Sequence, residues 1–260
     1  MKQADLLLLK DFLNEKYFLY NNRNFIETDP VSIPHKFTKK QDIEIAAFLT
    51  ATIAWGNRQS IINNANKLMQ FMDFSPHSFV TESTSKDIKV FSKFVHRTFN
   101  GDDCIFFIQS LKQIYKKNES LEMLFSKGIQ PADVTIKNGI INFREAFFSI
   151  KHPARTQKHV SNPLKNSSSK RLCMFLRWMV RQDKAGVDFG IWKTINSSQL
   201  CLPLDVHTGN VSRKLGLLKR TQNDWQAVEE ITSLLRQLDS KDPVKYDFAL
   251  FGLGVFEKFK

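Results

Sequence analysis

The sequence predicts an all-α protein, and three observations support this fold class. Apolar residues recur at spacings of three and four along most of the 260-residue chain, as they do in amphipathic helices. No run of residues alternates between apolar and polar with a period of two, which is the pattern of a half-buried strand. No internal repeat is visible, so a solenoid is not expected. The chain contains 42% hydrophobic residues and 23 Phe, so it can bury a sizeable core.

The first part of the chain predicts four helices. A leucine-rich stretch from Leu6 to Leu19 has one apolar face and forms the first of them. Residues 42–72 predict a helix pair, in which the first member is apolar nearly all round and the second carries an apolar stripe. The joint of this pair is Trp55-Gly56-Asn57-Arg58. Pro76 suits the first turn of a further short helix.

The middle of the chain predicts more helices and then a long loop. Helical periodicity covers residues 87–98, 102–117, 119–127 and 140–148. Residues 151–169 lack periodicity and contain two prolines and three consecutive serines, which predicts a loop. Loops of this length in compact proteins are more often functional than idle. We expect Ser169 to be the N-cap of a strong helix over Lys170–Arg181.

The last part predicts an irregular segment followed by three helices. Residues 183–204 contain glycines and no regular pattern. The helices are expected over 206–217, over 225–238 and from Pro243 to about Leu253. Asp205 and Asp224 precede two of them and are expected as N-caps.

The positive charge of the chain is concentrated in one segment. The formal net charge is +12, and eight of these charges lie between Glu145 and Asp183, where there is no acidic residue. They are Lys151, Arg155, Lys158, Lys165, Lys170, Arg171, Arg177 and Arg181. Such an excess favours a polyanion such as nucleic acid, whose counterions are released on binding. The alternative is a solvated basic loop without a partner.

Several classes of protein are excluded or disfavoured by what the sequence lacks. No apolar stretch is long enough for a membrane-spanning helix, and none has the form of a signal peptide. The three cysteines, Cys104, Cys173 and Cys201, have no metal-site or disulfide spacing. Nucleotide-binding, zincin and serine-hydrolase motifs are missing as well. We therefore expect a cytoplasmic protein that acts without a metal or other cofactor and has no membrane partner.

One segment combines a carboxylate, an imidazole and a hydroxyl at the start of a helix. Leu202 to Leu218 has the sequence LPLDVHTGNVSRKLGLL. As N-cap, Asp205 would accept backbone N–H bonds and face the positive end of the helix dipole, which favours its ionised form. A role purely as a cap is the alternative to a role in chemistry.

This segment resembles the aspartate-bearing part of helix-hairpin-helix DNA glycosylases. Asp205 and His207 match the family's aspartate and histidine, whereas Arg213 lies further along than the family's arginine. Residues 242–255, DPVKYDFALFGLGV, are similar to the family's C-terminal helix, and residues 42–72 are similar to its first helix pair. Residues 170–181 also carry the KRL-MFLRWMVR signature of a bacterial family described only as conserved and of unknown function. The nearest functional analogues are archaeal 8-oxoguanine glycosylases.

The resemblance implies two helical subdomains that flank a cleft. The first would cover residues 41–182 and end in the hairpin-like segment; the second would combine 1–40 with 183–260 and carry the aspartate. The family's glycine-rich hairpin turn is replaced here by Asn166-Ser167-Ser168-Ser169. Serines can donate to phosphate but do not relax the backbone as glycine does.

The resemblance also implies a pair of catalytic residues. Lys170 matches the lysine nucleophile of the bifunctional members, although its spacing to Asp205, 35 residues, is longer than usual. Arg171 beside it and the helix N-terminus both favour the uncharged amine that attacks C1′. The Asp205 carboxylate would stabilise positive charge developing on the sugar. The alternative for Lys170 is a simple phosphate contact.

Further residues are expected to hold the DNA and the flipped base. The base pocket would use Trp55, Trp178 or Trp192, although tryptophans at helical spacing are more often core. The expected DNA contacts are Asn57, Arg58, Arg155, Lys158, Lys165, Ser168, Ser169, Arg171 and His207.

The sequence thus predicts a monomeric DNA-repair glycosylase acting on damaged double-stranded DNA. It would remove a damaged purine such as 8-oxoguanine by base flipping, and Lys170 would add AP-lyase activity. Two alternatives remain: a non-catalytic nucleic-acid-binding protein on a glycosylase-like scaffold, and a helical adaptor whose basic loop meets an acidic protein.

Overall fold

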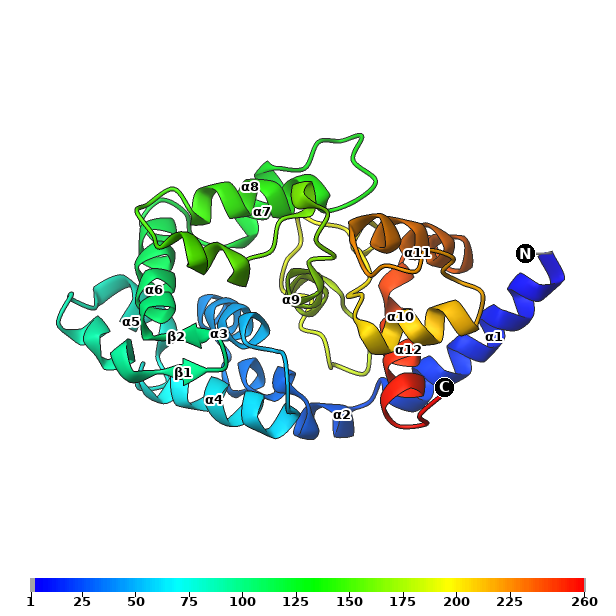
Figure 1. Cartoon of the computed structure of the whole chain (residues 1–260), viewed down its shortest axis with the longest axis horizontal. Helices are drawn as coiled ribbons and strands as arrows, with labels where there is room; N and C mark the ends of the chain where they lie inside the picture. Colours follow the sequence, from blue (N-terminus) through cyan, green and yellow to red (C-terminus); the bar gives the residue numbers. More distant parts are fainter. Residues whose placement is uncertain (1–2, 260) are drawn as a thin grey trace. The chain divides into compact units, whose positions relative to one another are not determined.

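The computed structural model describes residues 3–259 and is mainly helical, which confirms the all-α prediction (Figure 1). The helices are α1 (Gln3–Tyr20), α2 (Arg23–Thr28), α3 (Lys40–Thr52), α4 (Arg58–Gln70), α5 (Pro76–Glu82), α6 (Gly101–Tyr115), α7 (Glu122–Lys127), α8 (Lys137–Phe147), α9 (Lys170–Val180), α10 (Val206–Lys214), α11 (Trp225–Leu238) and α12 (Tyr246–Val255). Short 3₁₀ turns connect several of them. No helix within residues 3–259 has both the length and the apolar character needed to cross a membrane.

The helix predicted over residues 87–98 is wrong in its second half. A 3₁₀ turn covers Asp87–Lys93, and a small antiparallel hairpin follows, with strands β1 (Val95–His96) and β2 (Phe99–Asn100). The reason is packing: Phe91, Phe94 and Phe99 are all buried. A spacing of five between the last two would place them on different faces of one helix, so the chain turns instead.

The predicted loop over residues 151–169 is ordered in part. Two 3₁₀ turns form over Ala154–His159 and Pro163–Lys165. Asn166 then donates its side-chain N–H to Asp224, and its carbonyl accepts from the backbone of Trp225. These bonds tie the segment to the start of α11.

The chain forms two compact units, which we describe separately. The terminal unit comprises the described parts of residues 1–25, 132–136 and 162–260; the central unit comprises residues 26–131 and 137–161. Residues 162–182, grouped above with 41–161, fall in the terminal unit by this division.

The terminal unit is built around packing of α12 against α1 and α10 (Figure 1). Gly252 of α12 permits this close approach, since a Cβ there would lie 2.0 Å from the Tyr20 ring. Tyr20 in turn stacks on Phe256 at a centroid distance of 5.4 Å. Phe175, Leu176 and Trp178 of α9 are fully buried in the same unit.

The central unit has an aromatic core. Phe48 of α3, Phe107 of α6, and Phe143 and Phe147 of α8 pack with ring centroids 4.8 to 5.7 Å apart. A buried carboxylate, Glu44, accepts hydrogen bonds from the side chains of α6 and the segment before α7. Its neutral donors are Tyr115, Ser120 and the backbone N–H of Leu121.

Candidate active site

Lys170 and Asp205 lie next to each other in the terminal unit. The Nζ atom of Lys170 is 3.7 Å from Oδ2 of Asp205. The two side chains are 26% and 25% exposed, so a ligand can reach both. An amine and a carboxylate that are 35 residues apart in the chain therefore share one site.

Asp205 is held by the start of α10, which confirms its prediction as an N-cap. Its Oδ1 accepts from the backbone N–H groups of His207 at 2.9 Å and Thr208 at 3.1 Å. The Thr208 hydroxyl accepts from the backbone N–H of Asp205 and completes a capping box. The side chain of Asn223 donates to the Asp205 carbonyl at 2.9 Å. One carboxylate oxygen is therefore used for the cap, and the other faces Lys170.

Lys170 is the first residue of α9, but the predicted cap before it is wrong. Ser169 makes no side-chain cap bond; its hydroxyl donates to the carbonyl of Ser167, and its φ is +49°. Asn166 also has a positive φ, of +57°. Residues other than glycine rarely adopt this conformation. The turn before α9 thus takes two left-handed positions without glycine, and the bonds from Asn166 to Asp224 and Trp225 help to hold it.

A second carboxylate, Asp247, belongs to the same site and was missed in the sequence analysis. It lies in the first turn of α12, is 6% exposed and accepts a hydrogen bond from Arg177. Burial raises the pKa of Asp247 to about 6; Arg177 and Lys170 act in the opposite direction, and Asp205 adds to the rise. The signal in the sequence is a single acid within the apolar run YDFALF, because a buried charge needs a partner.

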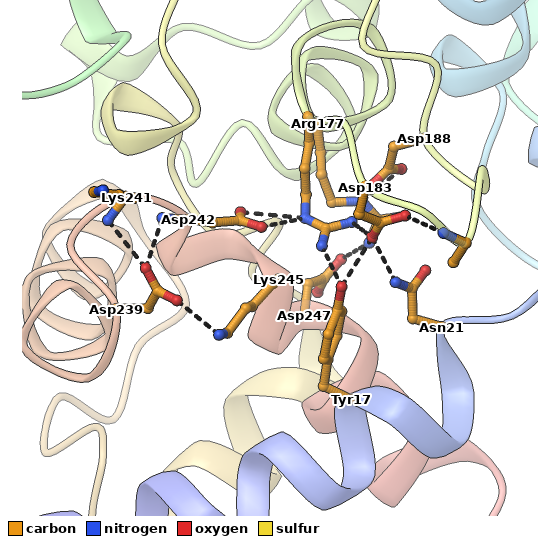
Figure 2. A network of polar contacts seen from close by, with 12 residues as sticks. Tyr17, Asn21, Arg177, Asp183, Asp188, Asp239, Lys241, Asp242, Lys245 and Asp247 are labelled. Carbon is orange, nitrogen blue, oxygen red and sulfur yellow. Dashed lines mark hydrogen bonds and ion pairs between the residues drawn. The ribbon is translucent and has the colours of Figure 1, made fainter.

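A network of ion pairs supports the far half of α9 (Figure 2). Arg181 is 1% exposed and forms ion pairs with Asp183 at 2.7 Å, Asp188 at 3.0 Å and Asp242 at 2.9 Å. It also donates to the Tyr17 hydroxyl at 2.8 Å, which links α1 to α9. Burial would raise the pKa of Asp183, yet Arg181 and side-chain donors hold it at about 2. The network anchors α9, whose first residue is Lys170.

This network corrects the charge argument made from the sequence. Arg177 and Arg181, counted there among eight charges for a polyanion, are 4% and 1% exposed and are paired with carboxylates. They lie seven and eleven residues after Lys170; Arg177 is in α9, and Arg181 directly follows the last residue of that helix. Arg171 is half-buried, and desolvation lowers its pKa to about 10. The surface therefore carries fewer of the eight charges than the sequence suggests.

The remaining expected site residues of the terminal unit fall into two groups. Lys165 and His207 are exposed, and Ser168 is half-buried, so these three can meet a ligand. Ser169, Trp178 and Trp192 are buried at 2%, 0% and 1% exposure. In this structure the two tryptophans are part of the core of the unit and offer no exposed face to a base.

Five of the expected residues lie in the central unit. Asn57 is the N-cap of α4 and accepts from the backbone N–H of Ser60 at 3.0 Å. Trp55 is half-buried, with its ring stacked on His159. Arg155 is paired with the buried Asp103 at 2.8 Å, whereas Lys158 is exposed. Arg58, half-buried, opens α4.

A metal site is not evident in the part of the chain that the structure describes. Within residues 3–259 no three His, Cys, Asp or Glu side chains are placed so that they could hold a metal ion. The candidate site itself offers one amine, that of Lys170, and two carboxylates, those of Asp205 and Asp247.

The comparisons with known proteins place the chain in a family. No curated protein and no solved structure matches it. One family model matches residues 29–256, which is most of the chain and includes Lys170, Asp205 and Asp247. The chain belongs to the family described as protein of unknown function (DUF2400).

Proposed function

We propose that this protein is a DNA glycosylase that releases a damaged purine and that Lys170 gives it AP-lyase activity. The observation that carries the proposal is the 3.7 Å approach of the Lys170 amine to the Asp205 carboxylate at the start of two helices. The resemblance of residues 202–218 and 242–255 to helix-hairpin-helix glycosylases supports the choice of substrate. The exposed Lys165 and His207 are available to contact DNA beside the pair.

The reaction follows from what the two groups can do. The Lys170 ammonium gives one proton to water, and the electron pair freed on Nζ attacks C1′ of the flipped nucleotide. The C1′–N bond breaks, its electron pair leaves with the base, and the base takes up a proton. The Asp205 carboxylate stabilises the positive charge that develops at C1′ during this step. The substituted nitrogen then loses a proton, the C1′–O4′ bond breaks and O4′ takes up a proton, which leaves the opened sugar linked to Lys170 as an imine. Water removes the C2′ proton, the electron pair of that C–H bond forms a C2′–C3′ double bond, and the C3′–O bond breaks so that the 3′ phosphate leaves.

Reductive trapping tests this proposal directly. Duplex oligonucleotides, each with one 8-oxoguanine or one abasic site, are incubated with the protein and sodium borohydride, which converts the imine to a stable amine. We expect a covalent protein–DNA band that disappears in Lys170→Ala. The pair is partly exposed, so its loss costs less than about 1 kcal/mol of stability and the variant stays folded.

The matched control is Lys214→Ala, which removes an exposed lysine from the end of α10 in the same unit. This variant should trap DNA as well as the wild type does. DNA binding without trapping or base release would contradict the proposal and support a non-catalytic nucleic-acid-binding protein. Equal trapping by Lys170→Ala would show that another amine is the nucleophile.

A further inference from the structure

Arg97 occupies a backbone position that is unfavourable for its residue type. It is the first of two residues, Arg97 and Thr98, that connect β1 to β2, and its φ is +56°. Glycine or asparagine is usual where a hairpin needs positive φ, and other residues are strained there. Such strain persists where the surrounding structure holds it and is frequent at functional sites.

The hairpin beneath Arg97 is firmly held in the central unit. His96 is 4% exposed; its Nε2–H donates to the Trp55 carbonyl at 3.2 Å, and its Nδ1 accepts from Asn64 at 3.2 Å. Phe99 is 1% exposed and packs edge-on against Phe107. Arg97 and Thr98 are themselves exposed. The fold therefore presents these two residues on a rigid support.

The guanidinium of Arg97 lies over Gly56, at the joint of α3 and α4. A Cβ on Gly56 would be 2.9 Å from Nη1 and 3.2 Å from Cδ of Arg97. Gly56 has φ of +101°, so glycine is required there for conformation as well as space. The guanidinium forms no hydrogen bond or ion pair with any of the described residues. Its five N–H donors are thus open to a ligand.

The surroundings of Arg97 match a nucleic-acid surface. Arg155, 41% exposed, donates to the carbonyl of Thr98 at 2.7 Å and so brings a second guanidinium to the base of the hairpin. Asn57 is exposed directly after Gly56, and the half-buried ring of Trp55 precedes it. Exposed arginine and asparagine side chains are common donors to the phosphates of DNA.

We propose that Arg97, presented by the hairpin over Gly56, binds a backbone phosphate of duplex DNA. This proposal rests on the DNA partner of the proposed function and adds a contact in the central unit, whereas the Lys170–Asp205 pair belongs to the terminal unit. Guanidinium groups form bidentate hydrogen bonds with phosphate. Because the fold already holds the backbone of Arg97 in place, less conformational entropy is lost when the phosphate binds.

The test measures salt dependence of binding to an undamaged fluorescent duplex by anisotropy, in 50 to 300 mM KCl for all variants. Each phosphate contact contributes about 0.9 to the slope of log K against log salt. In Arg97→Gly we expect the slope to fall by about 0.9 and affinity to fall roughly eightfold at 0.1 M salt. Arg97→Lys keeps the charge and should keep the slope.

Stability separates a binding role from a structural one. Glycine suits the left-handed position, so Arg97→Gly should unfold at the same urea concentration as the wild type or a higher one. The control is Lys116→Gln, which removes one exposed positive charge just past the far end of α6, roughly 22 Å along that helix from the hairpin. It should leave the slope unchanged.

The possible outcomes divide the two proposals. A slope in Arg97→Gly equal to that of the wild type overturns the phosphate contact, even if base release and trapping are observed. A reduced slope without any base release supports the contact and refutes the glycosylase. Failure of the wild type to bind duplex DNA at all overturns both.

Discussion

Asp205 uses one carboxylate oxygen for the cap of α10 and turns the other toward Lys170, so two substitutions at this position should behave differently. Oδ1 accepts from the backbone N–H groups of His207 and Thr208, and Oδ2 faces Lys170 at 3.7 Å. Asparagine keeps the first oxygen and replaces the second by an amide N–H₂. Alanine removes both. A comparison of Asp205→Asn with Asp205→Ala therefore isolates the contribution of the charge.

The expected magnitudes follow from this geometry. The partly exposed pair with Lys170 contributes about 0.2–1 kcal/mol, and asparagine is as good an N-cap as aspartate. Asp205→Asn should thus lose only about 0.5 kcal/mol of unfolding free energy. Asp205→Ala also loses the cap, which adds about 1 kcal/mol. Under the proposed mechanism, base release should fall about 10²- to 10³-fold in both variants, because each removes the charge that would stabilise C1′ in the transition state.

Urea unfolding and single-turnover base release measure the two effects in the same preparations. Where the m value is unchanged, a shift of the urea midpoint reports a change in the free energy of unfolding alone. Equal destabilisation by both substitutions would refute the division of the two oxygens. Base release by Asp205→Asn at the wild-type rate would refute the assignment of this carboxylate to catalysis.

Three further predictions concern buried groups. Arg181→Met should lower the free energy of unfolding by about 3–5 kcal/mol, because it leaves the buried carboxylates around this 1% exposed guanidinium without a positive partner. Urea unfolding measures the change, and a loss below about 1 kcal/mol would contradict the prediction. The pKa of Asp247, raised by burial from 3.8 to about 6, means that its contribution to stability is complete below pH 4 and is lost as the pH rises through 6. The wild type should therefore lose stability relative to Asp247→Asn between about pH 4 and pH 6.5 and then level off, and a difference that is constant with pH across this window would refute this. Burial raises the pKa of the three thiols, those of Cys104, Cys173 and Cys201. They should therefore react with a thiol reagent only after the protein unfolds. Rapid labelling of the native protein would contradict their burial.

The helices could be predicted because their signals are local. The N-cap at Asp224 and the span of α11, Trp225–Leu238, agree with what the sequence indicates. The hairpin at residues 95–100 could not be predicted in this way, because its strands contain only two residues each. Its conformation depends on burying Phe94 and Phe99 together in a core that the local sequence does not describe.

The candidate site was predictable only in part. The Asp205 cap follows from residue type and position, but its approach to Lys170 was expected only from a family resemblance. Asp247 was missed since its partner, Arg177, is 70 residues away in the chain and the pairing depends on how α9 and α12 pack. Burial of Trp178 depends on tertiary packing in the same way.

The buried arginines in and after α9 mean that the net charge of the chain overstates the positive charge available to bind a polyanion. Arg177 and Arg181 neutralise buried carboxylates, and Arg155 is paired with Asp103, so these cations contribute less to the field outside the protein than a count of residues suggests. Counterion release depends on cations that reach phosphates, not on the formal total. Under the proposed function, affinity for DNA comes from a few exposed groups, and the proposed contact of Arg97, which lies outside the basic segment, becomes as important as any within it. A salt slope well below that of eight phosphate contacts is the expected consequence, and each contact can be assigned by removing one side chain at a time.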